Sequence, residues 1–445
     1  MDSPYSNLPD RAFWRTAVGE REPLDPGDLY VQKFPINKSM RIVTAGSCFA
    51  QHVGRVLRES GFAVVDTEPA PSALPDEVVQ KFGYRLFSAR YGNVYTTRQL
   101  LQLLDEVEGI ATPAEPVWER NGRFFDAMRP GVEPSGLPSP EDVLEHRRLH
   151  LKAVDEAFSS VDLFVFTFGL TEAWVHTESG TVYPTAPGTI AGNFDKNKYS
   201  FVNFGFADVL RDFQTFRARM LKRQPRLKFL VTVSPVPLTA TASGHHVEVA
   251  TAYSKAVLRA VAGQISATSP NVDYFPSYEI ITSANNRGVY FETNKRSVSM
   301  LGVETAMSLF MRAHQVSGTP EATPDPGSKR TKRRAEGNQE DDAAAELVCE
   351  EALLEAFRKW QGFSSSATRT VPRSGLPGTA WPNSSPRLRC DSLLLAVMRF
   401  VASIWMTAAF SAASQSLLFR RTTCSGSDFR MTGSRLTAIG QIMSF

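Results

Sequence analysis

The 445-residue sequence is poor in cysteine, with only Cys48, Cys349, Cys390 and Cys424 and no CxxC pair. This scarcity excludes a disulfide-stapled scaffold and a zinc ribbon. The chain also lacks an excess of charge of one sign, since its formal net charge is +3. Its 42% hydrophobic and 21% charged residues are ordinary for a globular protein. The composition therefore predicts one large folded domain with additions, or two to three smaller domains.

The small net charge hides an uneven distribution. Residues 358–445 carry ten Arg, one Lys and two Asp, a net of +9, which leaves −6 for residues 1–357. Because the main body is mildly acidic, we predict no nucleic-acid partner. Residues 1–18 contain no basic segment followed by an apolar core, so we expect no secretory signal and a cytoplasmic location.

Strands and helices alternate along the main body. Apolar runs rich in β-branched and aromatic residues predict strands at 41–46, 161–169, 227–238 and 272–281. Apolar residues at helical spacing predict helices at 47–62, 246–265 and 300–315. This alternation predicts an α/β fold, a three-layer α/β/α sandwich with a mainly parallel sheet.

The segments around this predicted domain, residues 41–316, differ from it in composition. Residues 1–40 are polar and Pro-rich with scattered aromatic residues, which indicates an arm on the domain surface. Residues 317–345 predict a disordered linker, and residues 346–445 an Arg/Ser-rich, poorly ordered tail with a short helix. Within the tail, residues 400–419 are about long enough to span a bilayer. Six Ser, Thr and Gln side chains interrupt this run, so we do not expect membrane association.

Ser47 is the first candidate site residue, because it lies between the predicted strand 41–46 and the helix that follows. A serine at this junction lies at the carboxyl edge of a parallel sheet, where crevices form. The start of the helix offers backbone amides that can stabilise an oxyanion. Ser47 can therefore be a nucleophile, or it can merely cap the helix. Cys48 is either a rival nucleophile or a small core residue.

Two further polar turns are candidates for the same site. Gly169, Thr171 and Glu172 follow the predicted strand 161–169 and so lie at the same edge of the sheet. The Thr171 side chain could donate to an oxyanion, and Glu172 could orient another residue or cap a helix. Gly92 permits a close backbone approach in the turn 90–96, whose amides could complete an oxyanion hole. For both segments an ordinary turn is the alternative.

These segments together resemble the GSCFA family, which is similar to the SGNH (GDSL-like) hydrolases. GSCFA at 46–50 is followed in order by ARYGNVYT, FTFGLTEAW, TVSPVPLTAT, YSKAVLRAVA and YFPSYEII, and the resemblance covers about residues 5–315. It implies an SGNH-type α/β/α fold and hydrolysis of an ester or acyl group, with no metal and no organic cofactor. By position, Ser47 matches the nucleophile, Gly92 and Asn93 match an oxyanion contributor, and Thr171 takes the place of the oxyanion Asn.

The sequence departs from the SGNH pattern at the catalytic base. SGNH enzymes have an Asp-x-x-His pair shortly before the last helix, in which the His is the base and the Asp orients it. Here Asn294 and Ser297 fall in the two places. A serine nucleophile needs a base within hydrogen-bond reach. We therefore predict His246, which follows the TVSPVPLTAT loop, as the substitute base, with His176 as the second choice.

The other histidines are less suited to this role. His52 lies on the predicted first helix and is expected to point away from Ser47. His146 and His150 lie on a charged helix and are expected to be solvated.

Two hypotheses follow. The first is a serine esterase or acyl hydrolase that cleaves an O-acyl ester of a glycan or small molecule. In it Ser47 attacks, and the Ser47 amide, Gly92 and the Thr171 side chain stabilise the oxyanion. The second is a catalytically silent protein that binds a glycan or another acylated ligand in the same cleft, which the missing Asp-x-x-His pair favours.

Overall fold

The computed structural model describes residues 3–314 and residue 354. The predicted linker, the predicted tail and its apolar run therefore lie outside the described residues, apart from residue 354. Among residues 3–314, no helix combines the length and the apolar character that a bilayer span requires.

A parallel sheet of four strands forms the centre of the domain. Its strands are β1 (Ile42–Gly46), β4 (Leu163–Phe168), β8 (Lys228–Val233) and β9 (Val272–Tyr274), in the order β1-β4-β8-β9. An isolated parallel bridge from Val64 to Ile42 extends the sheet beyond β1. Almost every strand residue is buried, as expected for a parallel sheet that is covered on both faces.

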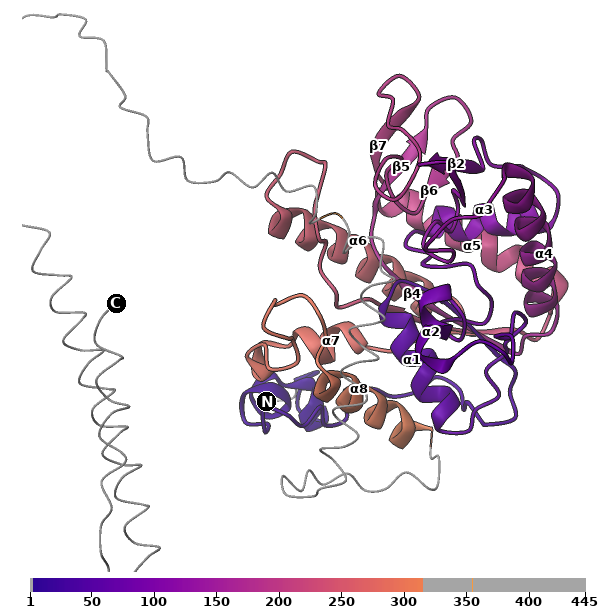
Figure 1. Cartoon of the computed structure of the whole chain (residues 1–445). Helices are drawn as coiled ribbons and strands as arrows, with labels where there is room; N and C mark the ends of the chain where they lie inside the picture. Colours follow the sequence, from indigo (N-terminus) through magenta and orange to yellow (C-terminus); the bar gives the residue numbers. More distant parts are fainter. Residues whose placement is uncertain (1–2, 315–353, 355–445) are drawn as a thin grey trace, which may run out of the picture. The chain divides into compact units, whose positions relative to one another are not determined.

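Helices cover both faces of this sheet, so the predicted three-layer α/β/α fold is confirmed (Figure 1). One face packs against α1 (Phe49–Glu59), α7 (Ser277–Thr282) and α8 (Met300–Ala313). The other face packs against α3 (Thr97–Val107), α4 (Pro140–Ser159), α5 (Phe206–Arg223) and α6 (Val247–Thr268). The three predicted helices correspond to α1, α6 and α8.

The predicted strand 272–281 is correct only in its first part. β9 ends at Tyr274, and residues 277–282 form helix α7. The physical reason is Pro276, which has no N–H to donate to the neighbouring strand and serves as the N-cap of α7.

Two small antiparallel sheets were not predicted. β5 (Glu172–His176) lies between β6 (Val182–Tyr183) and β7 (Tyr199–Asn203), and β2 (Val117–Arg120) pairs with β3 (Arg123–Asp126). The shorter helical elements are α2 (Asp76–Val79) and single turns at Asp10–Ala12, Arg15–Gly19, Gln80–Phe82 and Ala284–Asn286. β5 begins two residues after the Gly169-Leu170 turn, so this sheet continues directly from the carboxyl edge of β4.

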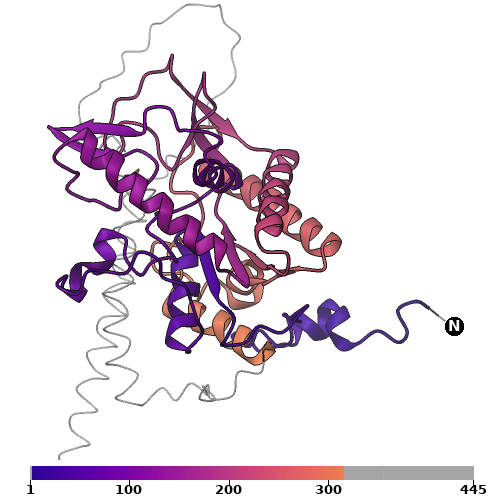
Figure 2. The ribbon, with the colours of Figure 1, turned by 90° about the vertical axis from the view of Figure 1, so that its right-hand side faces the viewer.

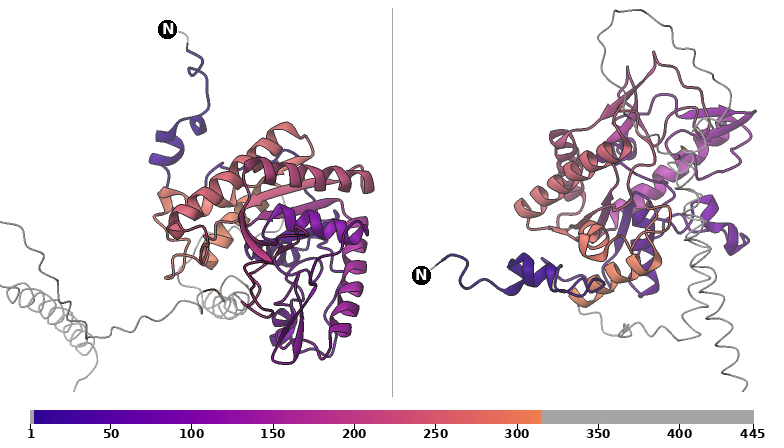
Figure 3. Two further views of the ribbon diagram at one scale, coloured as in Figure 1. Left: turned by 90° about the horizontal axis from the view of Figure 1, so that it is seen from above. Right: turned by 90° about the vertical axis from the view of Figure 1, so that its left-hand side faces the viewer.

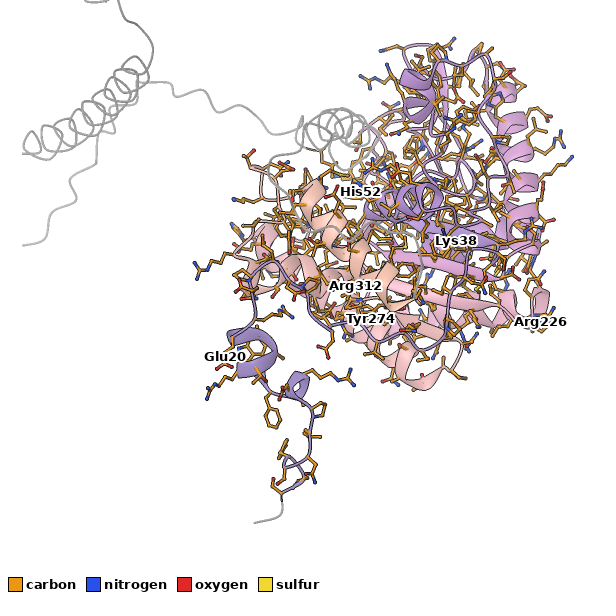
Figure 4. All side chains as sticks on the ribbon, turned by 90° about the horizontal axis from the view of Figure 1, so that it is seen from below. Glu20, Lys38, His52, Arg226, Tyr274 and Arg312 are labelled. Carbon is orange, nitrogen blue, oxygen red and sulfur yellow. The ribbon has the colours of Figure 1, made fainter. Side chains whose placement is uncertain are left out.

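The N-terminal arm has two parts. Residues 3–20 are mostly exposed and extend away from the domain, as Figures 2 and 3 show and as Glu20 marks in Figure 4. Nearer the domain, Tyr30 and Ile36 are buried. The Tyr30 hydroxyl donates to Asp273 at 2.9 Å, and the Ile36 amide donates to Nδ1 of His314 at 3.2 Å. Only this second part of the arm is fixed to the domain.

Helix α4 carries buried charged side chains, and the expectation that His150 is solvated is wrong. His150 is 1% exposed, and its Nδ1 donates to Glu68 at 2.6 Å. One turn earlier, Arg147 pairs with Asp126 at 2.9 Å and with Glu106. These acidic partners come from distant parts of the chain, so the charge of α4 alone did not reveal that its inner face is buried. His146 is exposed, as predicted.

Candidate active site

The turn from β1 into α1 fixes the position of Ser47. Gly46 has a φ of +137°, and a Cβ at this position would lie 2.5 Å from the carbonyl oxygen of Thr167. Only glycine fits there, so β1 can run against β4 up to Ser47. The Ser47 amide donates to the Thr167 carbonyl at 3.3 Å.

Ser47 does not cap helix α1. The N-cap residue is Cys48, which makes no side-chain capping bond. The Ser47 Oγ is buried and has no hydrogen-bond partner among the residues that the structure describes. The interpretation of Ser47 as a simple helix cap is therefore wrong, and its hydroxyl is left available for other chemistry.

Ser47, which is 3% exposed, lies on a small pocket at the carboxyl edge of the sheet. The pocket has a volume of about 10 Å³, which is roughly the room that one water molecule needs. Its lining residues come from five separate segments: Ser47, Cys48, Tyr95, Gly169, Leu170, Ser234, Val236, Pro237, Leu238 and Lys255. None of these described residues is a histidine or a carboxylate. Lys255 is the lining residue that carries an amine.

Lys255 extends from α6 to the turn that follows β4. It is 3% exposed, and its Nζ donates to the carbonyl oxygen of Gly169 at 2.7 Å. Gly169 also touches the nucleophile candidate, because a Cβ on Gly169 would lie 2.9 Å from the Cβ of Ser47. Sequence reasoning missed Lys255. The available signal was a lysine on the face of the predicted helix 246–265 that carries the apolar residues Leu258 and Ala262.

Tyr95 is another lining residue of the pocket, and its backbone is bonded to the turn after β4. Its carbonyl oxygen accepts the amides of Gly169 at 3.1 Å and Leu170 at 3.2 Å. The next residue, Thr96, begins α3 with a capping box, in which its side chain and that of Gln99 bond to each other's backbone amides. Tyr95, which lines the pocket, and Thr96, the N-cap of α3, are thus consecutive residues.

The predicted oxyanion turn at Gly92 and Asn93 lies beside β1 but does not line the Ser47 pocket. Gly92 has a φ of +68°, and the amide of Val94 donates to the Gly46 carbonyl at 2.9 Å. The buried Asn93 accepts a hydrogen bond from Gln51 of α1 at 3.1 Å. Asn93 lines a separate cavity, together with Tyr91, Glu106, Arg129, Arg147 and His150.

Thr171 and Glu172 are likewise held by other partners. The Thr171 hydroxyl donates to Oδ1 of Asn203 at 2.6 Å, and its amide donates to Ser254 at 3.1 Å. Glu172 accepts the Thr241 hydroxyl at 2.7 Å. Burial raises the pKa of Glu172, against the effect of this hydrogen bond. Neither side chain lines the Ser47 pocket, and Glu172 instead ties β5 to the loop that follows β8.

The two predicted histidine bases also lie outside the lining of this pocket. His246 is exposed and caps α6, with its Nδ1 accepting the Glu248 amide at 3.2 Å. His176 lies on β5, and its Nδ1 is 3.1 Å from the Ser179 hydroxyl. Both rings are therefore engaged in local hydrogen bonds.

The turn in place of the Asp-x-x-His pair is held by its own side chains. The Asn294 amide donates to the Ser297 hydroxyl at 2.8 Å, and Asn294 Oδ1 accepts the Ser297 amide. Neither residue lines the Ser47 pocket. Across residues 3–314, no group of three or more His, Cys, Asp or Glu side chains is placed to hold a metal ion.

Three further buried polar atoms, on β1, β4 and α1, also lack hydrogen-bond partners within the part of the chain that the structure describes. Besides Ser47 Oγ, the side-chain oxygens of Thr44 on β1 and Thr167 on β4 and Oε1 of Gln51 on α1 have no hydrogen-bond partner among the described residues. Most buried polar atoms in folded proteins are paired, so such a group needs an explanation. One explanation is that these atoms belong to a site that binds a polar ligand.

Comparisons with known proteins agree with the sequence analysis on the family. The GSCFA family matches residues 41–310, which is more than half of the chain. No curated protein matches the chain. Among solved structures, the chain is similar to a Clostridium thermocellum family 3 carbohydrate esterase, with 12% sequence identity and a TM-score of 0.19, over 50% of this chain and 86% of that one.

Proposed function

Since the chain belongs to the GSCFA family, we propose that it is a serine hydrolase of the esterase or acylesterase kind, acting on an O-acyl ester of a glycan or small molecule. The observation that carries this proposal is the state of the Ser47 hydroxyl. It is buried at the strand-to-helix turn, has no hydrogen-bond partner among the described residues and faces a pocket that also contains an amine. A hydroxyl with a purely structural role would normally be paired.

In the proposed reaction, Ser47 Oγ attacks the acyl carbon and gives up its proton. At the start of α1 the amides of Ala50 and Gln51 already donate to the carbonyl oxygens of Ser47 and Cys48, at 2.8 and 3.0 Å. In this proposal the Phe49 amide and the positive end of the helix dipole therefore stabilise the oxyanion. The ester oxygen then leaves as an alcohol, and water releases the acyl group from Ser47 in a second step. For Thr171 to contribute as well, its hydroxyl would have to give up its hydrogen bond to Asn203.

The test compares turnover of p-nitrophenyl acetate by the full-length chain and by Ser47→Ala. We expect the variant to lose at least about 1000-fold in rate, because removing the nucleophile of a serine hydrolase costs several powers of ten. Ser72→Ala, at an exposed position, is the control and should turn over the ester at the wild-type rate. Equal rates for wild type and Ser47→Ala would exclude Ser47 as the nucleophile. If Cys48→Ala abolished turnover instead, Cys48 would take that role.

The second candidate function is a catalytically silent protein that binds an acylated ligand or glycan at this edge of the sheet. It is favoured by the exposed turn at Asn294 and Ser297, which stands where the Asp-x-x-His pair of SGNH enzymes would be. It predicts that a fluorophosphonate probe labels neither wild type nor Ser47→Ala. Labelling at Ser47 would eliminate it.

A further inference from the structure

The proposed reaction requires a group that takes the proton of Ser47, and Lys255 is the lining residue suited to this. We propose that the Lys255 Nζ, as a neutral amine, is the proton acceptor for Ser47, an inference that rests on the proposed function. Nζ takes the hydroxyl proton while Oγ bonds to the acyl carbon, and it returns the proton to the ester oxygen as the carbon–oxygen bond breaks. In the second step the same amine takes a proton from water, and Ser47 Oγ recovers a proton as the acyl bond breaks.

The first support is the shared location. Ser47 and Lys255 come from opposite faces of the sheet, since α1 and α6 pack on different sides, yet both line one pocket of about 10 Å³. The two groups are not hydrogen-bonded to each other, because Ser47 Oγ has no partner among the described residues. Catalytic hydrogen bonds are often long in the free enzyme and shorten when substrate binds.

The second support is the hydrogen bond that positions the amine. The Gly169 carbonyl accepts one N–H of Lys255 at 2.7 Å, and the same glycine packs against the Ser47 side chain. A neutral amine can donate to Gly169 and still offer its lone pair to Ser47, whereas an ammonium has only donors. Gly169 thus holds Nζ at the turn that packs against the nucleophile.

The third support is the character of the pocket. Ser47 and Lys255 are both almost fully buried, and the other lining side chains include Leu170, Val236 and Leu238. Burial in apolar surroundings disfavours the charged form of an amine, which is why buried lysines serve as general bases. Serine–lysine pairs are a known variant of the serine–histidine arrangement.

The alternative is that Lys255 merely fastens α6 to the Gly169 turn. Two substitutions separate these roles. Lys255→Arg keeps a donor for the Gly169 carbonyl but cannot accept a proton at neutral pH. Lys255→Met removes the amine and retains a long side chain. Lys152→Met, at an exposed position on α4, is the control.

We expect both Lys255 variants to lose about 100-fold or more in p-nitrophenyl acetate turnover, the usual contribution of a general base. The wild-type rate should rise with pH through one ionisation, and the residual rate of Lys255→Arg should not show that rise. Far-ultraviolet circular dichroism and urea unfolding check that the variants fold. If Lys255→Met does not fold, Lys255→Arg and the pH profile still decide whether Lys255 is the proton acceptor.

The outcomes separate this inference from the proposed function. Wild-type turnover that depends on Ser47 but persists in Lys255→Arg would overturn the role of Lys255 and leave the hydrolase proposal intact. Wild type with neither turnover nor fluorophosphonate labelling at Ser47 would overturn both. Loss of turnover in Lys255→Arg, together with loss of the pH dependence, supports the role of Lys255.

Discussion

Acid should destabilise the folded domain through His150. The ring is buried against Glu68, and burial together with the charge of Arg129 lowers its pKa to about 4, from 6.5. Between these two values the unfolded chain binds a proton that the folded chain does not, so stability falls as pH falls. The free energy of unfolding should decrease by up to about 1.4 kcal/mol per pH unit, or about 3 kcal/mol in total. Below about pH 4 this contribution should not decrease further.

The assay is urea unfolding at several pH values between about pH 7 and about pH 4.5, with tryptophan fluorescence as the signal. His150→Gln removes the titration while its amide can still donate to Glu68, so its stability should depend less steeply on pH than that of wild type. Some slope should remain, because burial also lowers the pKa of His314 to about 4. His146→Gln, exposed on the same helix, should behave as wild type. Equal slopes for wild type and His150→Gln would refute the reasoning.

Two further variants test other features of the structure. Gly169→Ala would place a Cβ 2.9 Å from the Ser47 Cβ and 2.9 Å from the Tyr95 carbonyl oxygen, so we expect a lower kcat/KM and a loss of about 1–3 kcal/mol in stability, as for overpacking. Unchanged ester turnover and an unchanged urea midpoint would contradict this. Arg147→Met leaves Asp126 and Glu106 buried without their shared guanidinium and should cost about 3–5 kcal/mol by urea unfolding, whereas the exposed Arg148→Met should cost little. Similar losses in both variants would contradict the buried network.

The central part of the fold could be predicted because its apolar residues follow the period of each element. β1 differs from the predicted strand by one residue, and α8 ends at Ala313 rather than 315. The two small antiparallel sheets were not predicted because their strands are short and pack mainly on one face. In β5, for example, Ala173 is in the core, whereas Trp174 is only half-buried.

The site could be predicted only where local sequence determines it. Gly46 and Ser47 lie in one turn, and the requirement for glycine there is a property of that turn. Which side chains reach the Ser47 pocket depends on how distant segments pack. Lys255 comes from a helix far along the chain, whereas His246 at the start of the same helix is exposed and caps that helix.

The double hydrogen bond to the Tyr95 carbonyl has a mechanical consequence. Since Thr96 follows directly and opens α3, a displacement of that helix would pull on the Gly169 turn and through it on Lys255. A mutational scan of the whole chain should therefore find positions along α3 where substitutions lower p-nitrophenyl acetate turnover, although no α3 residue lines the Ser47 pocket.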